Sequence, residues 1–160
     1  MIKIILSDKR FNVDQKRLRS MIKTLIEDES SGASSVNVVY CNNRLMCDLN
    51  KNFLGHNGTT DVLAFDLDDG EREELLGEVY VNLQQARKQA KDFKIKYNEE
   101  VERLTVHGIL HLLGYDDKGA KSRREMWERQ EGFLKKWKRE RAIRTDRPTG
   151  TANPVFHCTN

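Results

Sequence analysis

The sequence predicts an α+β fold, a single domain with one mixed four-stranded β-sheet and about five helices packed on it. Short apolar runs alternate with segments of helical apolar spacing, but no helical pattern separates the third run (62–65) from the fourth (78–81). Consecutive strands without a helix between them favour a mixed sheet over a doubly wound parallel one. With 160 residues, the chain is long enough to bury one core.

Each element is predicted from its own local pattern. Apolar and β-branched runs bounded by turn residues predict strands at 2–6, 36–40, 62–65 and 78–81. Apolar residues recurring every three or four positions predict helices that follow the capping residues Asp14, Asn82 and Asn98, and two more helices at 43–53 and 119–138. The folded domain is therefore expected to cover residues 1–138, followed by a loose basic and polar tail at 139–160.

Composition and the N-terminal residues predict where the protein works. The chain is 38% hydrophobic and 33% charged, which is typical of a polar, foldable protein. The apolar run at 2–6 is too short for a signal peptide or a membrane span. The three cysteines form no Cys-x-x-Cys pair, so we expect reduced thiols without a metal or catalytic role. These features predict a cytoplasmic protein with no membrane partner.

Charge is distributed unevenly along the chain. Residues 118–147 carry a net charge of +7, whereas residues 1–117 carry −4. A basic segment of this kind can attract a polyanion such as RNA. The same run is equally typical of a solvated, charge-rich helix face. Charge alone leaves both interpretations open.

A pair of histidines in an apolar helical segment predicts a metal site. His107 and His111 are four residues apart and therefore share one helix face. Their neighbours are apolar, and imidazoles without partners would be costly there. Gly114 can reverse the chain at the helix end, and Asp117 follows three residues later. We predict that His107, His111 and Asp117 bind one zinc ion and leave a coordination position for water, as in catalytic sites.

The pattern does not place a general base beside this predicted metal. In His-Glu-x-x-His metalloproteases the residue after the first histidine is a glutamate that acts as the base. Here that residue is Gly108, so peptidase chemistry of this type is disfavoured. Asp116 is the candidate catalytic base that the sequence offers, although a metal alone can activate bound water.

The segment from His107 to Asp116 resembles the central motif of the YbeY family, bacterial endoribonucleases also described as ribosomal RNA maturation factors. Residues 50–65 and 76–79 agree with the family in order and spacing, so the resemblance covers about residues 1–138. It implies a zinc-dependent, single-strand-specific endoribonuclease that acts in ribosomal RNA maturation and ribosome quality control. Single-stranded RNA, ribosomal RNA and the ribosome are the partners it implies.

Two positions depart from the family's usual pattern. The motif usually ends in a third histidine, where this chain has Asp117, a residue that is also a competent zinc ligand. The family usually carries an arginine where this chain has Leu54, which cannot bind a phosphate. His56 and the basic C-terminal helix are candidates to replace that arginine.

These departures leave a second function open. Leu54 and Gly108 also fit a non-catalytic ribosome-assembly factor that binds RNA and holds a mainly structural metal. A metal-dependent hydrolase with a small-molecule substrate is a third option, for which the sequence specifies no pocket. For the nuclease, we expect RNA to lie in a groove bordered by residues 62–65 and 55–60.

Overall fold

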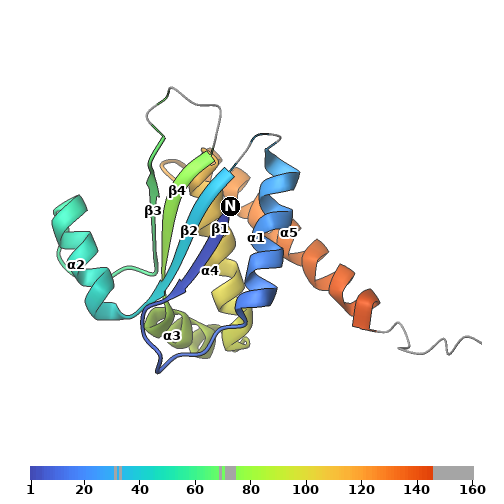
Figure 1. The fold of residues 1–160 in the computed structure, drawn as a ribbon, viewed down its shortest axis with the longest axis horizontal. Coiled ribbons are helices and arrows are strands. Elements are labelled where there is room, and N and C mark those ends of the chain that lie inside the picture. The colour runs from blue at the N-terminus through green and yellow to red at the C-terminus, as the bar shows by residue number, and fades with distance from the viewer. Residues whose placement is uncertain (31, 33, 69, 71–74, 146–160) are drawn as a thin grey trace, which may run out of the picture.

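The sheet of the computed structural model is mixed, and its four strands have the order β1-β2-β4-β3 (Figure 1). Three strands are parallel and the fourth is antiparallel at one edge. The parallel strands are β1 (Ile2–Leu6), β2 (Ser34–Cys41) and β4 (Leu75–Asn82), and the edge strand is β3 (Val62–Asp66). The structure describes residues 1–30, 32, 34–68, 70 and 75–145. It confirms the predicted α+β class.

Helices cover both faces of the sheet, but unequally (Figure 1). One face carries α1 (Gln15–Glu29) and α4 (Tyr97–Leu112), and α3 (Leu83–Phe93) and α5 (Ala120–Thr145) pack against α4. The other face carries α2 (Asn43–Leu54). Helix α4 therefore lies between the sheet and two further helices, so side chains around its circumference can meet partners from several elements.

The central strand β2 explains how α4 is held in place. Val38 and Tyr40 point into the core shared with α1 and α4, while Val39 and Cys41 point toward α2. Since both faces of a central strand are covered, the second half of β2, from Val38 to Cys41, carries no strongly polar side chain on either face. The Tyr40 hydroxyl and the Thr105 hydroxyl of α4 are hydrogen-bonded at 2.9 Å inside this core. This bond fixes α4 relative to the sheet.

Helix starts agree with the predicted caps in two cases out of three. The side chains of Asp14 and Asn82 accept hydrogen bonds from backbone N–H groups in the first turns of α1 and α3, as predicted. Asn98 as a cap is wrong, because α4 begins at Tyr97 and its N-terminal flanking residue is Lys96. The helical turn already closes on the Lys96 carbonyl, which places Asn98 inside the first turn.

Strands β2 and β4 and helix α5 are longer than expected. Strand β4 begins at Leu75 rather than at residue 78, because its pairing with β2 extends to Ser34. Helix α5 continues to Thr145, so residues 139–145 are helical rather than part of a loose tail. Arg, Glu and Ala dominate this stretch, and all three are strong helix formers even without an apolar stripe. Residues 146–160 lie outside the described part, and for these residues the loose tail stays a prediction. No described helix has the length and apolarity of a membrane span.

Cys41 and Cys47 are free thiols in different surroundings. Cys41 is fully buried, and burial raises the pKa of its thiol to about 12, whereas Cys47 is partly exposed. Because the thiolate is the reactive form, we expect iodoacetamide to label Cys47 at least about 10-fold faster than Cys41 in the native protein. Mass spectrometry of the two peptides measures this, and guanidinium should equalise the rates. Equal labelling before unfolding would contradict the burial of Cys41.

Candidate metal centre

His107 and His111 lie one turn apart on α4, and their side chains converge as predicted from their spacing. The two rings meet edge to face with centroids 4.7 Å apart, and their Nε2 atoms are 3.1 Å apart. Both side chains are half-buried. Burial, followed by the neighbouring His107, lowers the pKa of His111, which favours the neutral imidazole that binds a metal.

The other ring nitrogen of each histidine has its own partner. The Nδ1 atom of His107 lies 2.8 Å from the side-chain oxygen of Gln130, and Nδ1 of His111 lies 3.1 Å from the Tyr115 carbonyl oxygen. Carbonyl oxygens only accept hydrogen bonds, so each Nδ1 carries the proton and each Nε2 presents a lone pair. Two lone pairs at this separation repel each other, and a cation between them removes the repulsion.

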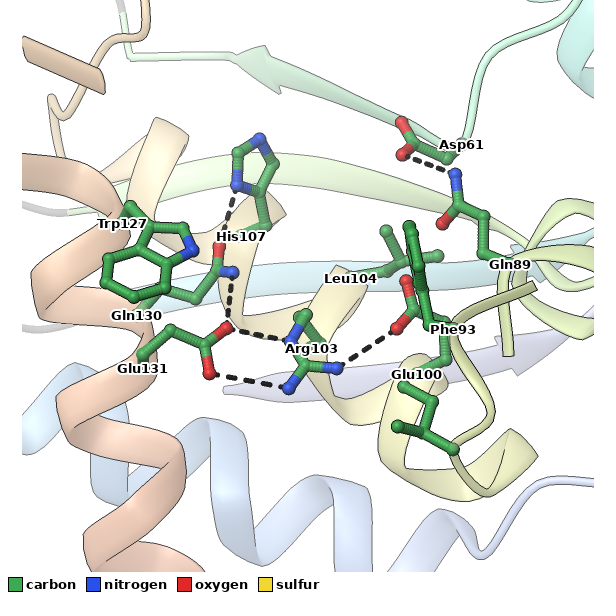
Figure 2. Close-up of a pocket in the computed structure, with 11 residues that line it drawn as sticks. Asp61, Gln89, Phe93, Glu100, Arg103, Leu104, His107, Trp127, Gln130 and Glu131 are labelled. Carbon is green, nitrogen blue, oxygen red and sulfur yellow. Dashed lines mark hydrogen bonds and ion pairs between the residues drawn. The ribbon is translucent and has the colours of Figure 1, made fainter. Parts of the chain in front are cut away.

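A chain of polar side chains fixes the orientation of Gln130 (Figure 2). Its amide nitrogen donates to Glu131 over 3.2 Å, which turns its oxygen toward His107. Glu131 accepts a second bond from Arg103 Nε at 2.8 Å, and Arg103 Nη1 donates to Glu100 at 3.1 Å. Burial raises the pKa of Glu100, and the bond from Arg103 opposes this shift. The network links α4 to α5 and holds one histidine in its metal-binding tautomer.

The end of α4 is built to bring a third group back toward the histidines. Gly114 has φ +96°, a left-handed conformation that glycine adopts without strain, and the chain reverses there. The Tyr115 hydroxyl donates to Glu29 of α1 at 3.0 Å, and Glu29 is also paired with Arg129 of α5. The segment after the helix is therefore anchored to two other helices.

Asp117 completes a group that could hold a metal ion. Its Oδ2 lies 3.8 Å from His111 Nε2, and one ligand atom from each of His107, His111 and Asp117 lies within 4.8 Å of the others. Two nitrogens bound to one tetrahedral zinc lie about 3.3 Å apart, close to the 3.1 Å of the histidine pair. The three residues thus fit a metal with nitrogen and carboxylate ligands.

Asp116, the candidate base, is placed differently. It is exposed, and its Oδ1 accepts a hydrogen bond of 3.0 Å from the backbone N–H of Lys118. This bond stabilises the turn after the helix. Its role as a base stays a prediction.

Gly108 lies on the side of α4 that faces the sheet, not on the side of the histidines. A Cβ atom at this position would lie 2.4 Å from Val79 Cγ1 and 3.0 Å from Val62 Cγ1. Only glycine lets α4 approach the strands this closely. The position therefore has no room for the glutamate of a metalloprotease, and packing gives a reason for glycine that is independent of catalysis.

The segment between α2 and β3 carries the other positions singled out in the sequence. Leu54 is the last residue of α2 and is exposed, and His56 is exposed beyond the Gly55 cap. His56 is not part of the group formed by His107, His111 and Asp117. Asp61, at the end of this segment, lines a cavity of about 530 Å³ together with His107 (Figure 2).

Sequence reasoning missed Gln130, although a signal for it exists. Met126, Phe133 and Trp137 form the buried stripe of α5, and Gln130 occupies the stripe position between them. A polar residue on a buried helix face requires a hydrogen-bond partner. The pattern could therefore have identified Gln130 as a partner of some polar group, but not which one.

Comparisons with known proteins show which family this chain resembles over most of its length. A family model described as Endoribonuclease YbeY matches residues 3–138. Proteins named Endoribonuclease YbeY from Chlorobaculum tepidum and Chlorobium phaeovibrioides are 33% and 34% identical over 122 and 121 residues, which is 76% of this chain in each case and 88% and 80% of theirs. The solution structure of TM1509 from Thermotoga maritima has 27% identity and a TM-score of 0.64, covering 98% of this chain and 100% of that one.

Proposed function

The chain belongs to the YbeY endoribonuclease family, and from this premise we propose that it is a zinc-dependent, single-strand-specific endoribonuclease. We further propose that it acts in ribosomal RNA maturation and ribosome quality control, with the ribosome as a partner. The observation that carries the metal dependence is the pair of converging Nε2 lone pairs, each set by a carbonyl oxygen bound to the opposite ring nitrogen.

His107, His111 and Asp117 would hold the zinc ion. When bound, zinc would supply a Lewis acid for a phosphoryl oxygen and lower the pKa of a bound water to about 7. Gln130 and the Tyr115 carbonyl keep the two imidazoles in the required tautomer. The half-exposed Asp117 leaves this side of the group open to a large substrate.

Electrostatic attraction supports RNA as the substrate. The basic helix α5 extends away from the sheet in Figure 1, and residues 118–147 carry a net charge of +7. We propose that the RNA backbone approaches along this helix and along a groove bordered by β3 and residues 55–60. Binding should then weaken steeply as salt concentration rises, because phosphate contacts release counterions.

The test is cleavage of a labelled single-stranded ribosomal RNA fragment, beside the same sequence in a duplex. We expect cleavage of the single strand only, loss of activity after chelation, and recovery with zinc. A His107→Ala preparation purified identically controls for contaminating ribonuclease. Equal cleavage by this variant would show a contaminant, and recovery with magnesium but not zinc would contradict the proposed metal.

A second candidate is a non-catalytic RNA-binding factor for ribosome assembly with a mainly structural metal. Leu54 favours it, because this residue cannot contact a phosphate where the family usually has an arginine. Gly108 no longer supports it, because that position faces the sheet. Salt-sensitive RNA binding without cleavage by zinc-loaded protein would establish this candidate instead.

Metal affinity should depend on Gln130. Gln130→Met keeps the side-chain length but removes the oxygen that accepts from His107. Loss of such an outer partner lowers metal affinity by roughly 10–100-fold. Competition with a chromophoric zinc chelator measures this change, and Gln130→Glu, which retains an acceptor oxygen, should bind zinc about as tightly as the natural protein. Unchanged zinc affinity in Gln130→Met would show that the tautomer of His107 does not depend on this contact.

A further inference from the structure

The cavity beside His107 has features that the proposed metal centre does not use. It lies between α3, α4 and α5, and its volume of about 530 Å³ falls in the range of small-molecule pockets (Figure 2). Because His107 lines it, a substrate held at the histidines would place a neighbouring group in or over this cavity. The following inference rests on the proposed function.

Two aromatic rings lie at opposite sides of this cavity. Trp127 of α5 is 62% exposed and Phe93 of α3 is 64% exposed (Figure 2). Side chains of this size are normally buried at least on one face, and here the free faces border a cavity. Flat apolar rings beside a binding site are the usual stacking surface for the bases of single-stranded nucleic acids.

The charge of the lining argues against a phosphate in the cavity itself. Asp61, Glu100 and Glu131 contribute three carboxylates, and Arg103 is the one lysine or arginine among the described lining residues. Arg103 is hydrogen-bonded to both Glu100 and Glu131, so its charge is already compensated. A phosphate would be repelled, whereas an uncharged base would not.

The polar atoms of the wall also distinguish between bases. The Asp61 carboxylate accepts hydrogen bonds from the Gln89 amide at 3.2 Å and from the Thr60 hydroxyl at 3.5 Å, and a carboxylate has further lone pairs available. An exocyclic amino group, as in adenine, cytosine or guanine, can donate to such an acceptor. Uracil has a carbonyl oxygen in place of the amino group of cytosine, and its one Watson–Crick-edge donor, N3–H, lies between two carbonyl oxygens that would face negative charge.

We propose that this cavity is a nucleobase subsite for the nucleotide next to the phosphodiester bond at the histidines. Trp127 supplies the stacking surface, and Asp61 favours bases with an exocyclic amino group over uracil. RNA would then lie with its backbone toward the basic helix and one base turned into the cavity.

The test measures, by fluorescence anisotropy, the affinity of zinc-loaded full-length protein for single-stranded oligo(C) and for oligo(U). The two oligonucleotides have equal length and are measured at the same salt concentration. These two pyrimidines match in ring size and differ in the amino group. We expect oligo(C) to bind about tenfold tighter than oligo(U), and Trp127→Ala to weaken oligo(C) binding about tenfold with an unchanged salt slope. Asp61→Asn should reduce the difference in affinity between oligo(C) and oligo(U).

Matched variants distinguish this subsite from a general loss of binding. Trp127→Phe keeps an aromatic ring and should retain most of the affinity for oligo(C). Phe53→Ala removes a similarly exposed ring from α2, and this variant should still bind oligo(C) more tightly than oligo(U). If Trp127→Ala binds and cleaves like the natural protein, the subsite is refuted while the nuclease proposal stands. If the natural protein neither binds nor cleaves RNA, both proposals fail.

Discussion

Replacing His111 by alanine should reduce RNA cleavage by more than about 100-fold. The variant loses one of two imidazoles whose Nε2 atoms lie 3.1 Å apart, and the remaining His107 and Asp117 cannot retain zinc at comparable affinity. Removing only an outer partner of a metal ligand already lowers affinity or activity by roughly 10–100-fold, so removal of a ligand should have a larger effect. Initial cleavage rates at saturating RNA, measured beside bound zinc per chain, test this expectation.

The matched control is His56→Ala, which removes a histidine that is not among the three proposed zinc ligands. This variant should bind as much zinc per chain as the natural protein. Thermal unfolding of both variants shows whether the fold is retained. Full zinc content together with full activity in His111→Ala would refute the proposed ligand set. Loss of zinc with unchanged cleavage would refute the role of the metal in the reaction, but not the site.

Replacing Gly108 by alanine should destabilise the fold by about 2 kcal/mol. In most helices this substitution is stabilising, because alanine has the higher helix propensity. Here the added methyl group would lie 2.4 Å from Val79 Cγ1, and Val79 is fully buried on the central strand β4. Overpacking of a rigid, β-branched contact typically costs about 1–3 kcal/mol. Urea unfolding curves give the change in free energy directly.

Gly132→Ala is the matched control for this prediction. Gly132 also lies inside a helix, α5, but a Cβ atom there would meet nothing within 4 Å. We expect this variant to be more stable by about 0.5–1 kcal/mol. Adding Val79→Ala to Gly108→Ala should give less destabilisation than the sum of the two single changes, since Val79→Ala removes the clashing methyl group. Stabilisation by Gly108→Ala alone would contradict the close approach of α4 to the sheet.

The clash that Gly108→Ala introduces should also affect function. Helix α4 carries both histidines, and its distance from β3 and β4 sets where they lie relative to Asp61 and the cavity. A variant that folds with a displaced α4 should therefore lose cleavage as well as stability. The same glycine that leaves no room for a protease-type base thus sets how close His107 and His111 lie to the sheet.

Local patterns in the sequence determined the class of the fold and the core of the site. Strands and helices follow from the spacing of apolar residues, and His107, His111, Gly114 and Asp117 lie within eleven residues of one another. Their geometry depends mainly on one helix and its end, so helical periodicity is sufficient to bring them together. The predicted cap at Asn98 and the predicted end of the last helix at residue 138 were wrong, because element boundaries depend on weak local preferences.

Only the tertiary structure decided which distant residues support that core. Gln130 meets His107 across 23 positions of sequence, and the Tyr115 hydroxyl meets Glu29 across 86. The cavity is lined by residues of α3, α4 and α5 together with Asp61. The close contact at Gly108 is made by Val79, which lies on a strand of the sheet beneath α4. Such contacts carry no periodic signal along the chain. They arise from the packing of helices on the sheet, which depends on all buried side chains together.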